Sequence, residues 1–444
     1  MSAGAVDLQL ENGSRVAVVG GGPAGSLFAY FLFRLANAID LELAVDIFEP
    51  RHFTHGGPAG CNHCGGIVSE SLVQYLATEG INLPPSVVQR GIYSYVLHMD
   101  VGSVEIESPV LEQRIASIYR GNGPRGGEDM PWDSFDGYLQ GMAEKEGARI
   151  IHQLVTRLGR ENGLPVVTTT DGKTAQYDFV ALAAGVNSNF RQLVGDEMLV
   201  GAPAVSRTFI SEFKAGQERI QELLGDSMHV FLLSLPRLEF AALIPKGDYI
   251  TMAMLGEEID RDLIADFLNT PVVKRAFPMQ AAPGVCTCAP LINMKGPRRP
   301  FSDRVVLIGD MGVTRLYKDG IGAAFRTAKA AAEAAVIHGI SEAELAEHYL
   351  PACRRIAVDN RYGHVIFAFM GIFRRSKFAR RVVLRMASAE QGRAKRRHMS
   401  GTLWNMFTGS APYREVFFRT LHPGFIFGLI WNAIASLRPA KKAR

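Results

Sequence analysis

The chain has 444 residues, of which 47% are hydrophobic and 21% are charged. This length and composition are ordinary for a folded enzyme with a large apolar core, and they exclude a disordered chain or a small disulfide-bonded scaffold. The charge is unevenly distributed: residues 351–444 contain 19 Lys and Arg against 3 Asp and Glu, whereas residues 1–350 contain 29 against 41. The acidic residues 1–350 and the basic residues 351–444 are therefore expected to lie in different surroundings.

The first residues of the chain give the expected compartment. Residues 1–14 contain neither a basic segment nor the apolar segment of a secretory signal, so we expect a cytoplasmic protein. In a reducing compartment, the five cysteines are expected to be thiols, metal ligands or redox groups rather than a disulfide framework.

A glycine-rich turn near the N-terminus is the strongest functional signal. Val16–Val19 is predicted to be a buried strand, and an apolar helix is predicted over residues 24–38. Gly20, Gly22 and Gly25 lie between them with G-x-G-x-x-G spacing. The first glycine of such a motif makes the turn, the second lets a pyrophosphate approach the backbone, and the third lets helix and strand pack closely. Free N–H groups at the helix N-terminus attract phosphate, so a bound dinucleotide is favoured over a plain turn.

A second predicted strand, over residues 43–48, ends in an acidic residue. Glu49 can accept hydrogen bonds from a ribose hydroxyl, as the acidic residue of this motif does. It follows Gly25 by 24 residues, slightly more than the usual spacing of about 20. A helix lengthened by one turn accounts for the difference.

Short strands and helices are predicted after Glu49. Ser69 is a predicted cap of a helix that ends at residue 78, and residues 93–107 form a predicted hairpin of a separate sheet. Residues 115–119 are predicted to form a strand.

A second G-x-G-x-x-G occurs at Gly121, Gly123 and Gly126. No apolar helix follows it directly, so a plain loop is favoured over a second nucleotide site. The next helix is predicted over residues 134–147.

Three further strands are predicted over residues 148–154, 166–170 and 178–183. The last of them leads into a second glycine turn at Gly185. This turn can pass close to the dinucleotide at the end of a parallel strand, or it can be only a turn.

An alternating, aromatic region spans residues 205–255, with helices predicted over residues 217–224 and 257–269. We assign it, together with the 93–107 hairpin, to a sheet that covers the substrate. The chain then returns to the first domain with a buried strand over residues 305–308.

The residues after that returning strand suit a flavin. Asp310 can hold a ribityl or ribose hydroxyl at the end of the strand. Gly320 and Gly322 open an alanine-rich helix whose N-terminus can face the flavin pyrimidine edge, where reduced flavin carries negative charge.

These motifs resemble a known group. GGGPAG with Glu49, AAGVNS, and IGD followed by DGIG occur in the order and spacing of flavoproteins with the para-hydroxybenzoate hydroxylase fold. Within that group, the chain is most similar to the geranylgeranyl reductase family, on the basis of Cys64-Gly65-Gly66, the SFD motif at residues 134–136 and PKGD at residues 245–248. The likeness covers about residues 15–340.

The resemblance implies FAD as the cofactor. It implies that Cys64 lies near the flavin and the reacting bond. The sequence does not reveal the electron donor: without a convincing second Rossmann motif, NAD(P)H would bind transiently, and a ferredoxin would serve equally well. The implied contacts are Gly20, Gly22, Gly25 and Glu49 with the ADP half, Asp310 with the ribityl chain, Gly320 and Gly322 with the isoalloxazine, and Gly65, Gly66, Arg120 and Gly185 as further cofactor contacts.

The sequence departs from the family patterns at three places. Ala184-Gly185 replaces the Asp-Gly of aromatic hydroxylases, which weakens a hydroxylase interpretation. Residues 240–245, FAALIP, lack the aromatic rings that the reductases usually carry before PKGD, so the expected prenyl pocket is reshaped. An insertion separates Arg120 from Ser134.

The cysteine pairs leave three interpretations open. Cys61-x-x-Cys64 and Cys286-x-Cys288 can form a zinc or iron–sulfur site, although C-x-C is a poor match to the common ligand spacing. Cys61 and Cys64 can form a redox dithiol. The favoured interpretation is a pocket lining in which Cys64 is a proton donor. The loop histidines are assigned no ligand role; they are His52, His55 and His63.

The basic tail, residues 354–444, mixes cationic clusters with apolar helical segments. Its last apolar run, residues 425–437, is shorter than the roughly 20 residues needed to span a bilayer. Attachment to a membrane surface is favoured, with a packed helical layer or a dimer contact as the alternative. No nucleic-acid-binding fold accompanies the basic residues, so nucleic acid is disfavoured.

Together these features predict an α/β protein: a Rossmann-type FAD-binding domain, an inserted, mostly antiparallel β substrate domain and a C-terminal helical extension. The predicted FAD-binding segments are 1–92, 111–200 and 301–345, the substrate segments are 93–110 and 201–300, and the extension is 346–444.

The predicted function is FAD-dependent reduction of a carbon–carbon double bond in a hydrophobic, prenyl-lipid-like substrate, on the cytoplasmic face of a membrane. A flavin monooxygenase or halogenase, and an electron-transfer flavoprotein with an electron-donor protein as partner, are the alternatives.

Overall fold

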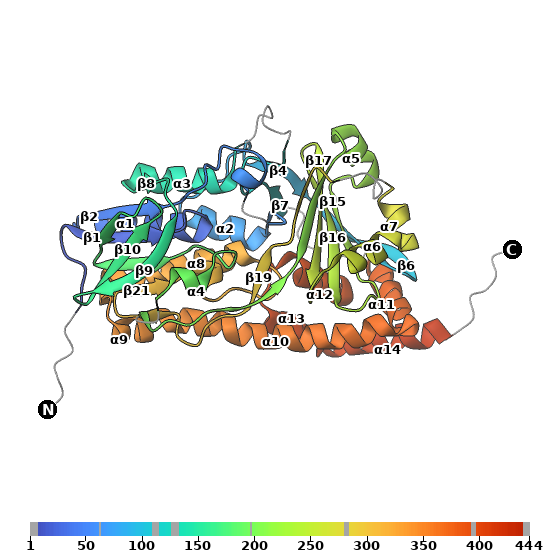
Figure 1. The fold of residues 1–444 in the computed structure, drawn as a ribbon. Helices are drawn as coiled ribbons and strands as arrows, with labels where there is room; N and C mark the ends of the chain where they lie inside the picture. The colour runs from blue at the N-terminus through green and yellow to red at the C-terminus, as the bar shows by residue number, and fades with distance from the viewer. Residues whose placement is uncertain are drawn as a thin grey trace. The chain divides into compact units, whose positions relative to one another are not determined.

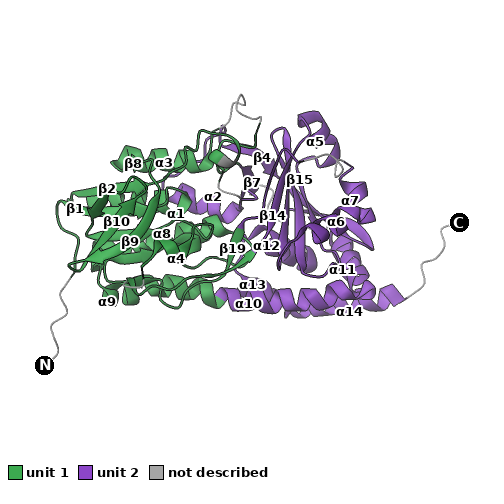
Figure 2. Cartoon of the chain, in the orientation of Figure 1, with its two compact units in different colours: residues 1–62, 119–206, 291–358 green, residues 63–118, 207–290, 359–444 purple. Residues whose placement is uncertain are grey.

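The computed structural model describes residues 8–61, 64–108, 115–125, 133–195, 198–278, 284–391 and 397–437 (Figure 1). It divides into two compact units. Unit 1 comprises residues 1–62, 119–206 and 291–358, and unit 2 comprises residues 63–118, 207–290 and 359–444 (Figure 2). These bounds differ from the predicted ones, because residues 64–92 and the strand at 115–118 pair and pack within unit 2.

Unit 1 is built on a six-stranded sheet of order β20-β21-β12-β1-β2-β8. Each neighbouring pair is parallel except β20 with β21, as expected for a doubly wound fold. The strands are β1 (Ser14–Val19), β2 (Leu43–Phe48), β8 (Arg149–Ile151), β12 (Phe179–Leu182), β20 (Phe301–Ser302) and β21 (Val305–Leu307).

Both faces of this sheet are covered, which explains why β1 and β12 are almost wholly apolar. On one face, α1 (Pro23–Asn37) packs against α3 (Phe135–Glu146) and α8 (Gly320–Glu333). On the other face, a core cluster joins the sheet to a three-stranded antiparallel sheet of β9 (Val155–Glu161), β10 (Leu164–Thr169) and β11 (Thr174–Gln176).

The remaining elements of unit 1 are short. They are η1 (Gly57–Ala59), α4 (Phe190–Leu193), β13 (Ala204–Arg207), β19 (Leu291–Lys295), η3 (Gly309–Met311), η4 (Ala334–His338), α9 (Glu342–Glu344) and η5 (Leu345–Tyr349). The pairing of β13 with β19 closes the unit where the chain leaves for unit 2 and returns.

Unit 2 is built on a seven-stranded sheet of order β18-β14-β17-β16-β15-β5-β6. The predicted hairpin forms its far edge, so the assignment of this hairpin to the same sheet as residues 205–255 is confirmed. The strands are β5 (Ser94–Met99), β6 (Gly102–Glu107), β14 (Phe209–Lys214), β15 (Ser227–Phe231), β16 (Leu238–Lys246), β17 (Tyr249–Gly256) and β18 (Cys286–Cys288).

Helices cover both faces of the unit 2 sheet. One face packs into a core cluster with α5 (Gln217–Leu223), α6 (Arg261–Asn269) and α7 (Pro271–Ala276). The other face receives α12 (His398–Thr408), whose Trp404 ring meets Tyr95 edge-on at a centroid distance of 5.1 Å. A helix from the basic tail is therefore part of the core of unit 2.

Smaller elements complete unit 2. A three-stranded sheet contains β3 (Ile67–Val68), β7 (Ile115–Ile118) and β4 (Val88–Ile92), and α2 (Glu70–Thr78) follows β3. The tail helices besides α12 are α10 (Leu350–Arg375), which begins in unit 1, α11 (Lys377–Glu390), α13 (Tyr413–Thr420) and α14 (Pro423–Leu437).

No single helix in the described part of the chain has the length and apolar character needed to cross a bilayer. Helices α13 and α14 meet that test only as a pair, and the chain bends by 59° between them.

Several sequence-based boundaries are confirmed and one is wrong. Ser69 and Ser134 cap α2 and α3, accepting hydrogen bonds from the backbone N–H groups of residues 72 and 137. The helix predicted from residue 257 instead begins at Arg261, because the Asp260 side chain caps it there.

Candidate functional site

The turn between β1 and α1 has the geometry that its glycines predict. Gly20 has φ +104°, and a Cβ built on it would lie 2.5 Å from the Ala183 carbonyl oxygen. A Cβ on Gly25 would lie 1.9 Å from the Gly20 carbonyl oxygen, so the close approach of helix and strand requires glycine. Gly22 precedes α1, and no side chain caps the free N–H groups there. These N–H groups are available to a phosphate.

Glu49 lies at the end of β2, as predicted, and is only 3% exposed. Its Oε2 accepts a hydrogen bond from the Gly21 N–H at 2.9 Å, and its Oε1 accepts one from the Arg51 N–H at 2.9 Å. Burial raises the pKa of Glu49, while the two backbone hydrogen bonds and the Arg51 charge act in the opposite direction. The carboxylate is thus fixed beside the glycine turn, where its remaining lone pairs can accept ribose hydroxyls.

The SFD motif holds Arg120 in place. The carboxylate of Asp136, which is fully buried, accepts hydrogen bonds from Arg120 Nε at 3.0 Å and Nη2 at 2.9 Å. The Ser134 hydroxyl donates to the Arg120 carbonyl at 2.6 Å while it caps α3. Ser134 and Asp136 therefore fix both the backbone and the side chain of Arg120.

Asp310 stands at the end of β21, as predicted, on the η3 turn. Burial raises the pKa of its carboxyl group, while a hydrogen bond with Thr314 and the charge of Arg120 act in the opposite direction. The Asn293 amide donates to the carbonyls of Asp310 and Gly312 at 2.8 and 3.0 Å, which fixes the turn. Arg120 and Asp310 thus share one electrostatic environment.

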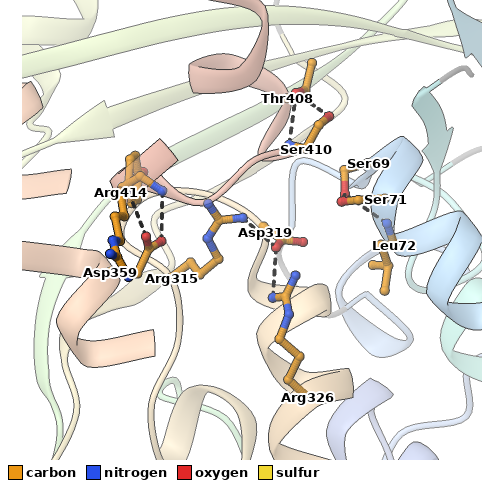
Figure 3. A network of polar contacts seen from close by, with 11 residues as sticks. Ser69, Ser71, Leu72, Arg315, Asp319, Arg326, Asp359, Thr408, Ser410 and Arg414 are labelled. Atoms are coloured by element: carbon orange, nitrogen blue, oxygen red, sulfur yellow. Dashed lines mark hydrogen bonds and ion pairs between the residues drawn. The ribbon is translucent and has the colours of Figure 1, made fainter. Parts of the chain in front are cut away.

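The start of α8 is held by an ion cluster that sequence reasoning missed. Asp319 precedes the helix with φ +55°, and its Oδ2 accepts hydrogen bonds from Arg315 at 2.9 Å and Arg326 at 3.1 Å (Figure 3). A Cβ on Gly322 would lie 2.1 Å from Asp319 Oδ1, so this glycine makes room for the carboxylate. A Cβ on Gly320 would lie 3.6 Å from Asp310 Oδ1. The positive end of the helix dipole at this N-terminus favours an anion.

The second glycine turn lies next to the first. Gly185 has φ +70° with open space where a Cβ would be, and Ser188 donates to its carbonyl at 2.6 Å. The preceding Ala183 is the residue that Gly20 approaches. Ala183 and Ala184 thus lie against the nucleotide-binding turn, and the contact of Gly185 with the dinucleotide stays a prediction.

The loop after Arg120 is not a second nucleotide site in the described residues. Gly57 donates to the Gly123 carbonyl at 2.8 Å, and a Cβ on Gly121 would lie 2.3 Å from the Gly60 carbonyl oxygen. This loop packs on the segment that follows Glu49, and Gly126 lies outside the described residues.

The residues of unit 1 fit the ADP half and the ribityl chain of FAD. An open helix N-terminus, a glycine turn without room for a Cβ, and a fixed buried carboxylate converge at the carboxyl ends of β1 and β2. Asp310 follows the neighbouring strand β21 in the same sheet. This is the end of a parallel sheet at which such cofactors bind.

In unit 2, the Cys64-Gly65-Gly66 loop packs against β16. Gly66 has φ +67°, and a Cβ on it would lie 2.1 Å from the Ile118 carbonyl oxygen and 2.7 Å from Lys246 Nζ. The Gly66 N–H donates to Cys64 Sγ at 3.3 Å. Lys246 of the PKGD motif is thus a buried cation beside the loop, a placement that the motif alone did not reveal.

The sheet face opposite α5–α7 is apolar along β16 at Phe240, Ala242 and Ile244, and it also carries the buried polar residues Lys246, Thr251 and Glu212. Because directly paired residues on antiparallel strands share a face, the register joins Ile244, Thr251, Glu212 and Cys286 in one row across four strands. The Thr251 hydroxyl donates to Glu212, whose pKa burial raises and the charge of Lys246 lowers. Phe240 on the same face of β16 contacts Phe407 of α12. Small Ala242 lies between Phe240 and Ile244 where the reductases usually carry rings.

The cysteines do not form a metal cluster in the described structure. None of the five is in a disulfide in the described part of the chain, and Cys286 and Cys288 face the same side of β18. Among the described residues, the one group of three side chains close enough to share an ion is His338, Glu344 and His348. The two imidazoles are stacked at 3.4 Å with a 6° interplanar angle, so a single ion cannot lie in both ring planes.

The loop histidines make contacts with one another. His52 stacks on His152 at a centroid distance of 3.8 Å, and the charge of His152 lowers the pKa of His52. His55 Nδ1 lies 3.3 Å from the His52 carbonyl oxygen. His63 lies outside the described residues.

Comparison with known proteins agrees with this geometry. No family model matches the chain. A protein of Synechocystis sp. (strain ATCC 27184 / PCC 6803 / Kazusa) named geranylgeranyl diphosphate reductase is 23% identical over 342 residues, which cover 72% of this chain and 75% of that protein.

Solved flavoproteins share the fold. The flavin-dependent brominase Bmp2 superposes with a TM-score of 0.58 at 15% identity, covering 90% of this chain and 100% of that chain. Klebsiella pneumoniae HpxO, complexed with FAD and uric acid, superposes with a TM-score of 0.58 at 17% identity, covering 89% and 97% of the two chains.

Fold, site and comparisons support an FAD-dependent oxidoreductase with a Rossmann-type FAD-binding domain. The chain resembles the geranylgeranyl reductase-like members of this group.

Proposed function

We propose that this protein reduces a carbon–carbon double bond in a hydrophobic, prenyl-lipid-like substrate. The observation that carries the proposal is the apolar row of Phe240, Ala242 and Ile244 on β16, beside the Cys64-Gly65-Gly66 loop. Ile244 Cδ1 lies 3.5 Å from where a Gly65 Cβ would be, so loop and sheet face are adjacent. The likeness to a protein named geranylgeranyl diphosphate reductase supports the same class of substrate.

The proposed substrate face has small residues on β16 at positions where the reductases usually carry aromatic ones. Ala242 and Ile244 are buried on β16, and Phe240 on the same face contacts Phe407 of α12. This row offers dispersion contacts, and the polar groups of the same face, Thr251 and Glu212, are hydrogen-bonded to each other. A branched hydrocarbon chain is the ligand that it suits.

The chain would supply the binding residues and a proton. FAD, when bound, supplies hydride from N5. We assign the proton to the Cys64 thiol: one alkene carbon takes the hydride, the other takes the thiol proton, and the thiolate regains a proton from water. Glu49, Arg120 and Asp310 would position the cofactor. NAD(P)H or a ferredoxin would restore the reduced flavin.

Matched cysteine variants test the assignment of the acid. We expect Cys64→Ala to lower the rate of substrate reduction by about 100-fold or more, the usual range for general acid catalysis, and to leave FAD bound. Cys61→Ala should keep the wild-type rate. Equal losses in both variants would point instead to a dithiol, and an unchanged rate in Cys64→Ala would remove the acid role.

Oxygen-dependent chemistry is the second candidate, because Bmp2 and HpxO share the fold. A monooxygenase or halogenase would consume oxygen in proportion to substrate. Ala184-Gly185, where aromatic hydroxylases carry Asp-Gly, speaks for the reductase. Electron transfer through the cysteine pairs, the third candidate, would require stoichiometric iron or a reversible Cys61–Cys64 disulfide.

A further inference from the structure

An unpartnered apolar face lies on α14 in unit 2. Phe427, Trp431 and Leu437 are 69%, 64% and 72% exposed, unusual values for such large apolar side chains. The face recurs with helical periodicity. It consists of Ile426, Phe427, Ile430, Trp431, Ile434 and Leu437.

The opposite side of α14 is the one that packs on the protein. A Cβ on Gly428 would lie 2.7 Å from Met386 Cε of α11, and the Ala435 carbonyl accepts a hydrogen bond from Arg385 at 3.1 Å. Positions 428 and 435 are separated by two helical turns and so share one side of the helix. The exposed apolar residues therefore belong to an outward face rather than to a frayed end.

A second apolar row lies on α10 in the same unit. Val365, Phe369 and Ile372 have helical spacing and are 41%, 55% and 65% exposed. Helices α10 and α14 both run along the lower edge of unit 2 in Figure 2. Unit 2 thus exposes two apolar rows, one on α14 and one on α10, which we call together the apolar border.

Unpaired cations accompany this border. Lys377 and Arg381 are exposed on α11 one turn apart, and within the described residues neither has a carboxylate partner. Arg375 at the end of α10 and Arg414 on α13 are also exposed and have no carboxylate partner within that part of the chain. Arg385 extends the α11 row to the α14 backbone.

The few acidic residues of the tail do not offset these charges. Asp359 accepts hydrogen bonds from the backbone N–H groups of Tyr413 and Arg414 and so fixes the start of α13. Glu390, which is buried, accepts hydrogen bonds from the first N–H groups of α12. Glu415 is paired with Arg419. The outer surface of the tail is therefore cationic as well as apolar.

We propose that α10, α11 and α14 form a docking surface for an anionic lipid bilayer. Aromatic and aliphatic side chains of α14 enter the boundary between headgroups and acyl chains, and the α11 cations meet anionic headgroups. A soluble protein partner would match an apolar patch, but it would not account for the accompanying row of unpaired cations. The proposal concerns binding alone and does not depend on the proposed reaction.

Sedimentation of the full-length, FAD-loaded protein with vesicles tests this surface. We expect binding to vesicles that mix phosphatidylcholine with phosphatidylserine, weakening as salt is raised, and little binding to phosphatidylcholine alone. Ile430→Glu/Trp431→Glu should bind at least about tenfold more weakly. Ile39→Glu, a matched change at an apolar residue that is 58% exposed in unit 1, should bind like the wild type.

Charge variants complete the test. Lys377→Gln/Arg381→Gln should weaken binding about 25-fold, since each cation near an anionic surface contributes about fivefold. Lys145→Gln/Lys274→Gln, with exposed lysines from α3 and α7, is the control. Failure of the wild type to sediment with anionic vesicles, or undiminished binding by the α14 variant, overturns the proposal. So does a wild-type dimer that Ile430→Glu/Trp431→Glu converts to monomer, because the face would then meet a second copy.

Discussion

Both side-chain nitrogens that Arg120 directs toward Asp136 reach its carboxylate, Nε at 3.0 Å and Nη2 at 2.9 Å, and the carboxylate is fully buried. A fork of this kind fixes a guanidinium in orientation as well as position. Because the Arg120 charge also acts on Asp310, the pair connects the SFD motif to the predicted ribityl site. The contact of Arg120 with the flavin stays a prediction.

Breaking this pair should weaken the cofactor site. Asp136→Ala leaves Arg120 without its buried partner, a change that typically costs about 3–5 kcal/mol. We expect a lower melting temperature and FAD affinity reduced by about tenfold or more, measured by flavin fluorescence. Asp133→Ala removes an exposed carboxylate three residues earlier and should alter neither. Wild-type FAD affinity in Asp136→Ala would contradict this role.

The nucleotide-binding turn gives a steric prediction with an internal control. Gly25→Ala places a methyl group 1.9 Å from the Gly20 carbonyl oxygen, so strand and helix must separate, at a cost of about 1–3 kcal/mol and with loss of bound FAD. Gly141→Ala, on α3 with open space around it, should raise the free energy of unfolding by up to about 1 kcal/mol. If Gly25→Ala and Gly141→Ala were purified with equal amounts of bound FAD, the close packing of strand β1 against helix α1 would be refuted.

The two adjacent glycines of the Cys64-Gly65-Gly66 loop should respond differently to substitution by alanine. Gly66→Ala meets the Ile118 carbonyl oxygen at 2.1 Å and Lys246 Nζ at 2.7 Å, with the backbone in the left-handed region. A Cβ on Gly65 meets only Ile244 Cδ1, at 3.5 Å. We expect Gly66→Ala to lose stability and most substrate reduction, and Gly65→Ala to keep both. If Gly65→Ala reduced stability and activity more than Gly66→Ala, the conformation described for this loop would be contradicted.

Two buried histidines predict a loss of stability in acid. Burial lowers the pKa of His98 to about 4 and that of His229 to about 3, and their rings are hydrogen-bonded at 3.1 Å. Between about pH 4 and 6.5 the unfolded chain binds a proton at each imidazole and the folded chain does not, so stability falls as pH falls, by about 1.4 kcal/mol per unit for each group.

Melting temperatures at pH 7 and pH 5 check this. The wild type should lose stability over that interval, and His98→Gln/His229→Gln should lose about 2 kcal/mol less for each imidazole removed. His364→Gln, at an exposed site, should keep the wild-type pH dependence. A pH dependence unchanged in the double variant would show that other groups carry it.

The sequence predicted the elements whose signals are local. The glycine turn, Glu49 at the end of its strand and the serine caps at Ser69 and Ser134 depend on residues within a few positions of one another. Their roles therefore follow from spacing. The strands of the 93–107 hairpin were equally visible because an alternating pattern surrounds a short turn.

The features that were missed depend on contacts between distant residues. The ion pairs of Asp319 with Arg315 and Arg326 are an exception: the three residues are close in sequence, but their pairing depends on how the chain turns into α8. The packing of Trp404 on Tyr95, and the hydrogen bond that Trp404 donates to Glu70, join a tail helix to segments more than 300 residues earlier. Strand β9 also escaped prediction, because polar residues interrupt its apolar ones.

The measurement that tests the reductase account most directly is anaerobic. The purified FAD-loaded protein is reduced with a limiting amount of dithionite, mixed with geranylgeranyl diphosphate without oxygen, and followed by its visible spectrum and by mass analysis of the product. The account predicts return of the oxidised flavin spectrum only when substrate is present, with a product two hydrogens heavier. A flavin that stays reduced until oxygen is admitted, and then consumes oxygen in proportion to substrate, would contradict it.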